Sequence, residues 1–292
     1  MQNIFFIGLG MMGKPMVQML SSAGYSIWVH DTSPSRLDEI CLLTSAKVFN
    51  ENSDLSIIDV VITMLPDSNT VEDALFGNSG VASRLKKGVI VIDMSSSEPM
   101  RSRHIYKKLS DIGISYVDAP VSGGVKRAID GTLAIMAGGD VEAFQKVDSI
   151  LGVMGKNIFH VGEAGSGHAV KALNNYLSAI TTIATAEALI IGKSFGLDQK
   201  KMVEVFNAST GRSNATENKA LQFMVSGTFS AGFTMSLMVK DITIASQLGE
   251  QVGYSMDMGD ASLQAWGKAM HLLGKTVDHT AVYQYVESKL NK

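Results

Sequence analysis

Short apolar runs alternate with amphipathic stretches through the first half of the chain. The run at 4–7 is followed by a helix-like stretch at 14–22 and then by a second run at 27–30. Near-continuous apolar runs are typical of strands covered on both faces, and their alternation with helices predicts a doubly wound, mostly parallel sheet. Further runs lie at 60–64, 89–92, 116–117, 133–137 and 158–161, separated by helical stretches that include 70–75, 100–110 and 141–149.

The pattern changes near Gly162, after which the apolar spacing is helical and strand-like runs disappear. We therefore predict an α/β domain at 1–162 and an all-helical domain at 163–292. The first helix of the second half would span about 45 Å at 1.5 Å per residue, long enough to join the domains and face the crevice between them. The predicted helices lie at 166–195, 199–208, 214–224, 235–249, 257–270 and 281–290.

Composition narrows the range of partners. The chain has 292 residues, 46% of them hydrophobic and 18% charged, and a net charge of −3, which excludes a strongly basic nucleic-acid or membrane surface. The single cysteine, Cys41, excludes a disulfide framework, and the six histidines show no metal-ligand spacing. The longest apolar stretch, 177–191, contains Glu187 and is predicted to be a core helix rather than a membrane span. We expect no targeting leader, a cytoplasmic location, and small-molecule or protein partners.

A glycine motif follows the first predicted strand. Gly8, Gly10 and Gly13 form G-x-G-x-x-G immediately before a predicted helix, and a second strand then ends in Asp31. In this context the glycines allow a tight turn, a close approach of a pyrophosphate and close helix–strand packing. The helix N-terminus offers N–H groups to the phosphates. The motif, with its inner residues Met11 and Met12, is predicted to bind a dinucleotide; the alternative is a glycine-rich turn without a ligand.

Asp31 favours NAD over NADP. A carboxylate at this position accepts hydrogen bonds from the adenosine ribose hydroxyls and repels a 2′-phosphate. Arg36 is the only nearby cation, and a solvated helix-surface position is the expected one for it.

Ligands of doubly wound sheets bind beyond the carboxyl ends of the strands. Three polar segments are expected there: 65–68, 93–97 and 118–124. In the third, the Ser122 hydroxyl and the backbone N–H groups of Gly123 and Gly124 suit a substrate carboxylate. An ordinary turn is the alternative interpretation of the same residues.

A polar stripe begins the long predicted helix. Lys171, Asn174, Asn175 and Ser178 share one face at spacings of three, four and seven residues. An ammonium held by an asparagine suits a general acid that protonates the alkoxide formed when hydride adds to a carbonyl carbon. The reverse reaction requires a lysine pKa below its ordinary value, which burial and a cationic nicotinamide would both favour. The alternative is a lysine that reaches solvent.

Two further residues are candidates on the helical half. Lys240, followed by Asp241, ends an apolar stretch, where a surface position is the ordinary alternative. Phe233 lies just upstream and either packs on a cofactor ring or fills the core.

Together these segments resemble the β-hydroxyacid dehydrogenase family, which includes 3-hydroxyisobutyrate dehydrogenases and tartronate semialdehyde reductases. The resemblance covers the whole chain and rests on 8–16, 118–124, the run Gly165-x-Gly167-x-x-x-Lys171-x-x-Asn174-Asn175, and 240–241. It implies a Rossmann domain followed by a helical domain, usually assembled as dimers or tetramers. It also implies that Lys171 is the catalytic acid/base. The resemblance implies that Ser122, Gly123 and Asn175 bind the substrate, that Lys240 lies near substrate and cofactor, and that Leu65, Pro66 and Ser96 contact the dinucleotide. We also predict that Gly124 and Asn174 bind the substrate and that Phe233 contacts the cofactor.

We therefore predict an NAD-dependent oxidoreductase that interconverts a small 3-hydroxy acid and its semialdehyde, with 3-hydroxyisobutyrate first. Tartronate, succinic or glyoxylate-type semialdehydes are alternatives, because 128–133 is closer to tartronate semialdehyde reductases while Gly211-Arg212 resembles 3-hydroxyisobutyrate dehydrogenases. Imine reduction is disfavoured, since those relatives usually replace the lysine by Asp or Tyr. A non-catalytic dinucleotide-binding module is a remote alternative.

Overall fold

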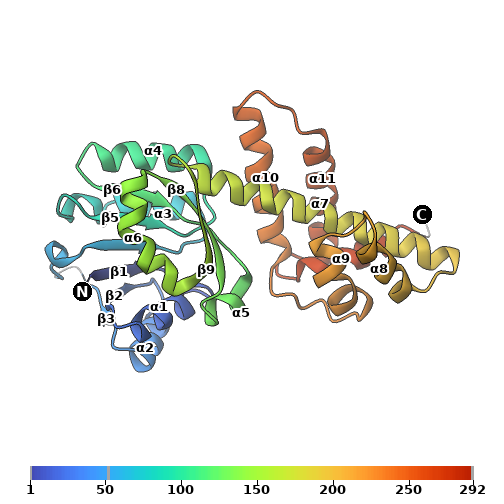
Figure 1. Ribbon diagram of the computed structural model, residues 1–292, viewed down its shortest axis with the longest axis horizontal. Coiled ribbons are helices and arrows are strands. Elements are labelled where there is room, and N and C mark those ends of the chain that lie inside the picture. Colours follow the sequence, from blue (N-terminus) through green and yellow to red (C-terminus); the bar gives the residue numbers. More distant parts are fainter. Residues whose placement is uncertain (1, 51–52, 291–292) are drawn as a thin grey trace. The chain divides into compact units, whose positions relative to one another are not determined.

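The computed structural model describes residues 2–50 and 53–290 (Figure 1). The chain divides into two compact units, Met1–Lys171 and Ala172–Lys292. The division falls inside one uninterrupted helix, α7 (Ser166–Phe195), whose bounds are those predicted from the sequence. The domain boundary expected after Gly162 remains a prediction.

The first unit is built on a sheet whose central strands are parallel. Its described strands follow the order β3-β2-β1-β4-β5-β6-β8-β7, with β9 paired to β8. The chain crosses from β1 outward to β3 and returns to the other side of β1 with β4, so the order reverses between β1 and β4. These strands are β1 (Asn3–Ile7), β2 (Ser26–His30), β3 (Lys47–Val48), β4 (Val60–Thr63), β5 (Ile90–Asp93) and β6 (Ser115–Asp118).

An antiparallel extension follows β6. Here β8 (Leu133–Gly139) runs antiparallel to β6 and to the short β7 (Val121–Ser122), while β9 (Gly155–Gly162) is parallel to β8. The doubly wound, mostly parallel sheet predicted from the apolar runs is thus confirmed, with β3 and β7 as short strands that the apolar runs did not predict.

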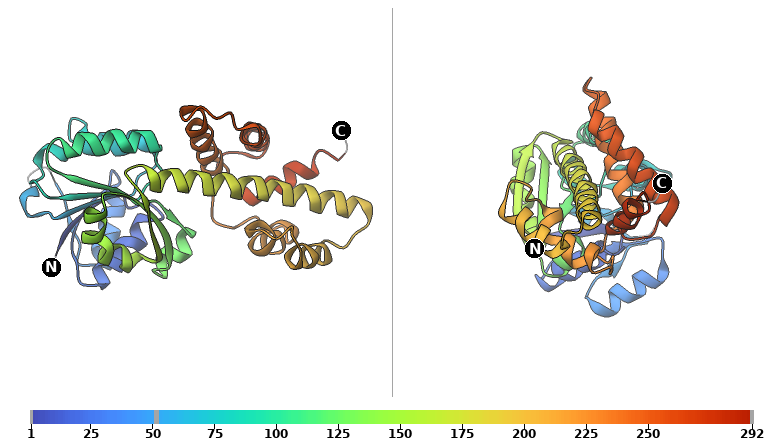
Figure 2. Two further views of the ribbon diagram at one scale, coloured as in Figure 1. Left: turned by 45° about the horizontal axis from the view of Figure 1, so that its top comes forward. Right: turned by 90° about the vertical axis from the view of Figure 1, so that its right-hand side faces the viewer.

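Helices cover both faces of this sheet because its strands are apolar on both sides. On β1, Ile4 and Phe6 face one core cluster, and Phe5 and Ile7 face another. The first cluster includes residues of α1 (Gly13–Ser22) and α6 (Val141–Met154), and the second includes residues of α3 (Ser68–Phe76) and α4 (Pro99–Ser110). Figure 2 shows α4 on one face of the sheet and α1 and α6 on the other. The remaining elements are α2 (Pro34–Leu43), α5 (Gly124–Ile129), and the 3₁₀ turns η1 (Leu55–Ile57) and η2 (Ala82–Arg84).

The second unit is helical in its described part. The indole of Trp266 is fully buried in its core, together with Ile242 and Val282. After the second half of α7 come α8 (Gln199–Ala208), α9 (Asn214–Asn218), the π-helix η3 (Ala220–Val225), α10 (Met235–Gln251), α11 (Asp257–Leu273), the 3₁₀ turn η4 (His279–Ala281) and α12 (Val282–Glu287).

Two helices are shorter than predicted, while α10 and α11 continue two and three residues beyond their predicted ends, to Gln251 and Leu273. The helix expected at 214–224 is interrupted at Lys219, whose backbone leaves the helical region at φ −127°. Its ammonium donates hydrogen bonds to Ser178 and Thr182 of α7, so a tertiary contact competes with helix continuity. The helix expected at 281–290 ends at Glu287, where the Ser288 hydroxyl donates to the carbonyl of Tyr285.

Within the described residues, no helix is both long enough and apolar enough to cross a membrane.

Candidate active site

The glycine loop between β1 and α1 has the shape that a pyrophosphate requires. A Cβ added to Gly8, whose φ is +104°, would lie 2.3 Å from the carbonyl oxygen of Met64. A Cβ on Gly13 would lie 1.9 Å from the carbonyl oxygen of Gly8, so the helix packs directly on the turn. A Cβ on Gly10 would meet no heavy atom within 4 Å. The open space at Gly10 is where the backbone of this motif approaches a dinucleotide, so the loop fits the group that the sequence predicts.

The N-terminus of α1 completes this cradle. The helix begins at Gly13, and its N-cap residue Met12 makes no side-chain capping hydrogen bond. Met11 is 68% exposed and Met12 is half-buried. Lys14 donates its amide to the Gly10 carbonyl at 3.1 Å and Pro15 has no N–H, so the amides that would face an anionic ligand are those of Gly13 and of the loop residues before it.

Asp31 closes the loop from the end of β2. Its Oδ2 accepts a hydrogen bond from the backbone N–H of Leu9 at 2.7 Å, and its Oδ1 accepts one from Ser33 at 2.8 Å. The guanidinium of Arg36 lies 3.5 Å from Oδ1, and the Arg36 side chain is 53% exposed. The predicted ribose acceptor therefore also holds the glycine loop, and Arg36 is the surface residue that was expected.

The predicted contacts after β4 and β5 lie at the same carboxyl edge of the sheet. The backbone N–H of Leu65 donates to the hydroxyl of Ser95 at 2.9 Å, which ties the two strand ends together. Leu65 and Ser96 are half-buried and Pro66 is exposed. These positions suit contacts with a dinucleotide lying across the β1–β4 switch point.

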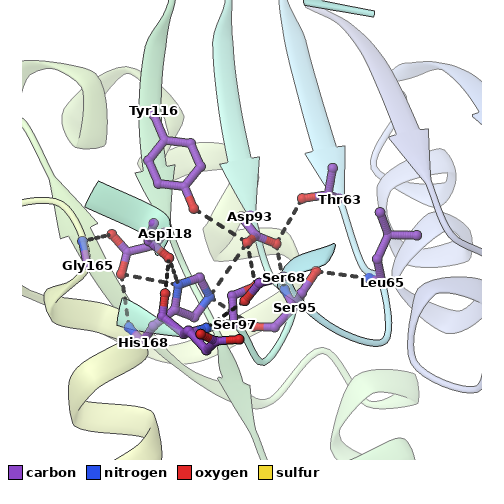
Figure 3. A network of polar contacts seen from close by, with 12 residues as sticks. Thr63, Leu65, Ser68, Asp93, Ser95, Ser97, Tyr116, Asp118, Gly165 and His168 are labelled. Atoms are coloured by element: carbon purple, nitrogen blue, oxygen red, sulfur yellow. Dashed lines mark hydrogen bonds and ion pairs between the residues drawn. The ribbon is translucent and has the colours of Figure 1, made fainter. Parts of the chain in front are cut away.

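Two buried carboxylates organise this edge (Figure 3). Asp93 accepts hydrogen bonds from the hydroxyls of Thr63 and Ser97, both at 2.9 Å, and from the Ser95 amide at 3.0 Å. The Tyr116 hydroxyl lies 3.4 Å from Asp93. Burial and the charge of Asp93 raise the pKa of Tyr116 well above its usual range, so Tyr116 remains a proton donor.

The second carboxylate, Asp118, holds the start of α7. Its two oxygens accept hydrogen bonds from the amides of Gly165 at 2.7 Å and His168 at 2.9 Å. The His168 ring makes two further contacts, from Nε2 to the carbonyl of Ser95 at 3.0 Å and from Nδ1 to the hydroxyl of Ser102 at 2.7 Å. Asp118 and Ser102 are fully buried, and His168 is 1% exposed. These contacts connect β5, β6, α4 and α7 within the first unit.

The expected carboxylate-binding segment follows β6 and includes β7. Ser122 is half-buried, and Gly123 and Gly124 have φ values of +134° and +70°. Two consecutive residues with positive φ turn the backbone sharply, and L side chains rarely adopt this conformation. The segment thus presents the Ser122 hydroxyl next to the backbone N–H groups of two glycines, which no side chain covers.

The polar stripe of α7 divides into buried and exposed members. Lys171 is 9% exposed and Asn175, one turn later, is 8% exposed, while Asn174 is exposed. Asn174 donates a hydrogen bond to Oδ1 of Asn175 at 3.0 Å. Asn175 in turn donates to Asp241 of α10, which fixes the orientation of its amide.

The two other candidate residues of the helical unit, Lys240 and Phe233, have different surroundings from each other. The Lys240 ammonium lies 3.9 Å from Asp241, and the Lys240 side chain is 27% exposed. Phe233 is half-buried, packs against the core of the unit, and contacts the His279 ring edge-to-face with centroids 5.7 Å apart.

Comparisons with known proteins agree with this arrangement. Residues 3–162 match the family described as the NAD binding domain of 6-phosphogluconate dehydrogenase. Residues 165–286 match the family described as NAD-binding of NADP-dependent 3-hydroxyisobutyrate dehydrogenase. The chain belongs to the β-hydroxyacid dehydrogenase family.

Relatives of this β-hydroxyacid dehydrogenase match it over nearly the whole length. The 2-(hydroxymethyl)glutarate dehydrogenase of Eubacterium barkeri is 38% identical over 272 residues, covering 92% of this chain and 90% of that protein. The 2-hydroxy-3-oxopropionate reductase of Escherichia coli K12 is 32% identical, covering 98% and 97%. The solved structure of Mycobacterium tuberculosis 3-hydroxyisobutyrate dehydrogenase with L-serine has a TM-score of 0.91 at 30% identity, covering 98% and 99%. The protein is thus an NAD-dependent oxidoreductase that acts on CH–OH groups, as the sequence predicted.

Sequence reasoning did not assign a role to His168 or Asp93 in this dehydrogenase. Both lie in segments that the sequence marked as polar, but their partners are distant in the chain. His168 contacts Ser102 and Ser95, 66 and 73 positions earlier, and Asp93 accepts from Thr63, 30 positions earlier. The sequence signal that could have found them is a charged residue at the end of an otherwise apolar strand, because such a residue needs a polar partner when it is buried.

Proposed function

We propose that this β-hydroxyacid dehydrogenase interconverts 2-substituted 3-hydroxypropionates and their semialdehydes, with 3-hydroxyisobutyrate the first candidate. The compounds in the names of its relatives share one carbon skeleton, which supports this proposal. 2-(Hydroxymethyl)glutarate, 3-hydroxyisobutyrate and L-serine each contain HOCH₂–CH(R)–COO⁻, and 2-hydroxy-3-oxopropionate is the aldehyde form with a hydroxyl as R. The group R is the part that differs, so the 2-hydroxy-3-oxopropionate alternative stays within this class.

The observation that carries the proposal is the burial of Lys171 one turn before Asn175 on α7. A lysine is rarely so buried without a specific role. NADH, when bound, supplies hydride to the carbonyl carbon of the semialdehyde. The Lys171 ammonium then stabilises the negative charge that develops on the carbonyl oxygen and donates the proton that completes the alcohol. In the oxidation direction, the neutral amine of Lys171 removes the hydroxyl proton.

The other residues have binding roles in this proposal. Ser122, Gly123 and Gly124 would bind the substrate carboxylate through a hydroxyl and backbone N–H groups, assisted by the amides of Asn174 and Asn175 and the ammonium of Lys240. The cofactor would be held by Gly8, Gly10, Met11, Met12, Gly13, Asp31, Leu65, Pro66, Ser96, Phe233 and Lys240. NAD is preferred because Asp31 is a carboxylate where a 2′-phosphate would lie.

The test is turnover with NADH and a panel of semialdehydes, comparing Lys171→Ala with the parent protein. Loss of the general acid is expected to lower kcat by about 10²–10⁴-fold while NADH still binds. Lys193→Ala is the matched control, because Lys193 lies on the same helix and pairs with Glu287 at the surface. Full activity of Lys171→Ala, or no turnover of any panel member by the parent protein, contradicts the proposal.

We also propose a homodimer or homotetramer and a cytoplasmic location. Support for self-association comes from large apolar side chains that are exposed on α7, with Leu177 at 61%, Ile191 at 67% and Phe195 at 83%. The single cysteine, Cys41, suits a reducing compartment. Light scattering during size-exclusion chromatography tests the assembly, and a monomeric mass contradicts it.

A further inference from the structure

The first turn of α7 is attached to the sheet at two independent points (Figure 3). The first is the Asp118 carboxylate at the end of β6, which accepts from the amides of Gly165 and His168. A carboxylate at a helix N-terminus satisfies amides that lack partners within the helix and interacts favourably with the helix dipole. The approach is close, because a Cβ on Gly167 would lie 2.7 Å from the Asp118 carbonyl oxygen.

The second attachment is the His168 side chain. Its Nε2 donates to the carbonyl of Ser95, an acceptor only, so this nitrogen carries a proton. Its Nδ1 lies 2.7 Å from the Ser102 hydroxyl on α4. A ring held at both nitrogens and at its own backbone amide cannot turn or shift along the helix axis without breaking a buried hydrogen bond.

Lys171 follows His168 by three residues, so the two side chains lie on neighbouring positions of one helix face. Any rotation of the first turn about the helix axis moves the lysine by a comparable angle. A displacement of about 1 Å at a reacting group costs about 10²-fold in rate.

We propose that Asp118 and His168 are positioning residues for Lys171, fixing the rotation and height of the first turn of α7 against the carboxyl edge of the sheet. This inference rests on the proposed role of Lys171 as the acid/base. A purely structural role for the same contacts would change the amount of folded protein but leave the chemistry of each folded molecule unchanged.

The test compares Asp118→Asn, His168→Leu and His168→Gln with the parent protein. Two matched controls make the same kind of change elsewhere. Asp198→Asn alters a carboxylate that accepts from the Lys201 amide at the start of α8. His160→Gln alters a histidine whose Nε2 contacts the carbonyl of Gly139 at 2.7 Å. The measurements are kcat per folded molecule, the Kd of NADH, the isotope effect with 4-deuterated NADH, and hydrogen exchange of residues 165–172.

For Asp118→Asn and His168→Leu we expect kcat to fall about 10-fold to 100-fold. The Kd of NADH should stay within about twofold, since neither side chain belongs to the cofactor cradle. The isotope effect should rise because hydride transfer becomes slower than product release, and exchange at residues 165–172 should accelerate. His168→Gln should recover part of kcat, since its amide retains a donor for Ser95, and both controls should match the parent protein.

A kcat per folded molecule within twofold of the parent for these variants, or a loss with an unchanged isotope effect, overturns the inference. If His168→Leu does not fold, Asp118→Asn and His168→Gln decide the outcome. If the parent protein turns over no semialdehyde, the proposed function fails. Hydrogen exchange then tests the attachment of α7 separately: unchanged exchange at residues 165–172 in Asp118→Asn and His168→Leu overturns it, and faster exchange supports it.

Discussion

The carboxylate of Asp31 accepts a hydrogen bond from the backbone N–H of Leu9 at 2.7 Å. This bond joins the middle of the glycine loop to the residue that follows β2. The Asp31 side chain is only 6% exposed, so the residue that should recognise the ribose also stabilises the loop that should hold the pyrophosphate. Cofactor choice and loop geometry are thereby coupled through one carboxylate.

Replacing Asp31 by serine is expected to shift cofactor preference toward NADP. The substitution removes the negative charge that opposes a 2′-phosphate and frees Arg36, which lies 3.5 Å from the Asp31 carboxylate. The ratio of kcat/KM for NAD to that for NADP should fall about 100-fold, or about 2.7 kcal/mol. Steady-state kinetics with both cofactors measure the ratio. Adding Arg36→Ala should reverse much of the gain, and an unchanged ratio in Asp31→Ser would show that this carboxylate does not select the cofactor.

Two glycines of the same motif should respond differently to alanine. In Gly13→Ala the new Cβ would lie 1.9 Å from the Gly8 carbonyl oxygen, so the free energy of unfolding should fall by about 2–3 kcal/mol. In Gly10→Ala the Cβ enters open space, so stability should change by less than about 0.5 kcal/mol. The Kd of NADH should nevertheless rise at least about 10-fold in Gly10→Ala, because the Cβ occupies the space of the pyrophosphate. Urea unfolding and NADH fluorescence separate the two effects, and equal loss of stability in both variants would refute the distinction.

His279 should make the protein less stable in acid. Burial, together with the nearby Lys219 ammonium, lowers its pKa from 6.5 to about 4. Between pH 6.5 and pH 4 the unfolded chain binds a proton at this residue that the folded chain does not bind. Stability contributed by neutral His279 is therefore complete above pH 6.5 and is lost as the pH falls, by about 3 kcal/mol in total.

The variant His279→Asn tests this assignment. Its amide retains a donor for the Phe233 carbonyl, which His279 contacts through Nδ1 at 3.1 Å, but it does not titrate. The free energy of unfolding between pH 7 and pH 4 should decline less steeply than in the parent protein. Identical slopes would assign the acid sensitivity to other groups.

Lys219 should limit stability near neutral pH. Burial lowers its pKa from 10.5 to about 8, and its ammonium hydrogen-bonds only to the hydroxyls of Ser178 and Thr182 among the described contacts. Between pH 8 and pH 10.5 the unfolded chain binds the extra proton, so stability rises with pH across that range by about 3 kcal/mol. Lys219→Met should remove this rise and increase the free energy of unfolding at pH 7 by about 1–2 kcal/mol after loss of the two hydrogen bonds.

Lys219→Arg is the control for Lys219→Met, because arginine keeps the positive charge at every accessible pH. It should leave the protein no more stable at pH 7 than the parent. A destabilised Lys219→Met with a normal circular dichroism spectrum would mean that the hydrogen bonds outweigh the burial of the charge.

The local spacing of apolar residues was sufficient to predict the elements in which no distant side chain competes with the local backbone conformation. The bounds of α7 and α8 follow from helical apolar spacing and from the residues at their ends, and the central parallel strands β1, β4 and β5 follow from short runs apolar on both faces. It was insufficient where a distant group competes with the backbone. Lys219 interrupts a helix that its neighbours favour, because its ammonium reaches hydroxyls on α7 about forty positions earlier in the chain.

For the candidate site, the sequence located the segments but not their connections. It named 8–13, Asp31, 118–124 and Lys171, because glycines, acids and a lysine in this order and at these spacings are typical of dinucleotide and substrate sites. It did not reveal that Asn174 is exposed while Asn175 is buried and held by Asp241. Exposure depends on what packs against each side of α7, which periodicity does not specify.

By itself the sequence determined the doubly wound sheet, the helical second half, the family and the residues proposed for chemistry, since these depend on local pattern and residue type. Only the tertiary structure decided that Asp118 and His168 attach α7 to the ends of β5 and β6. The physical reason is that buried polar groups must find hydrogen-bond partners, and which groups meet depends on how strands far apart in the chain align at one edge of a sheet.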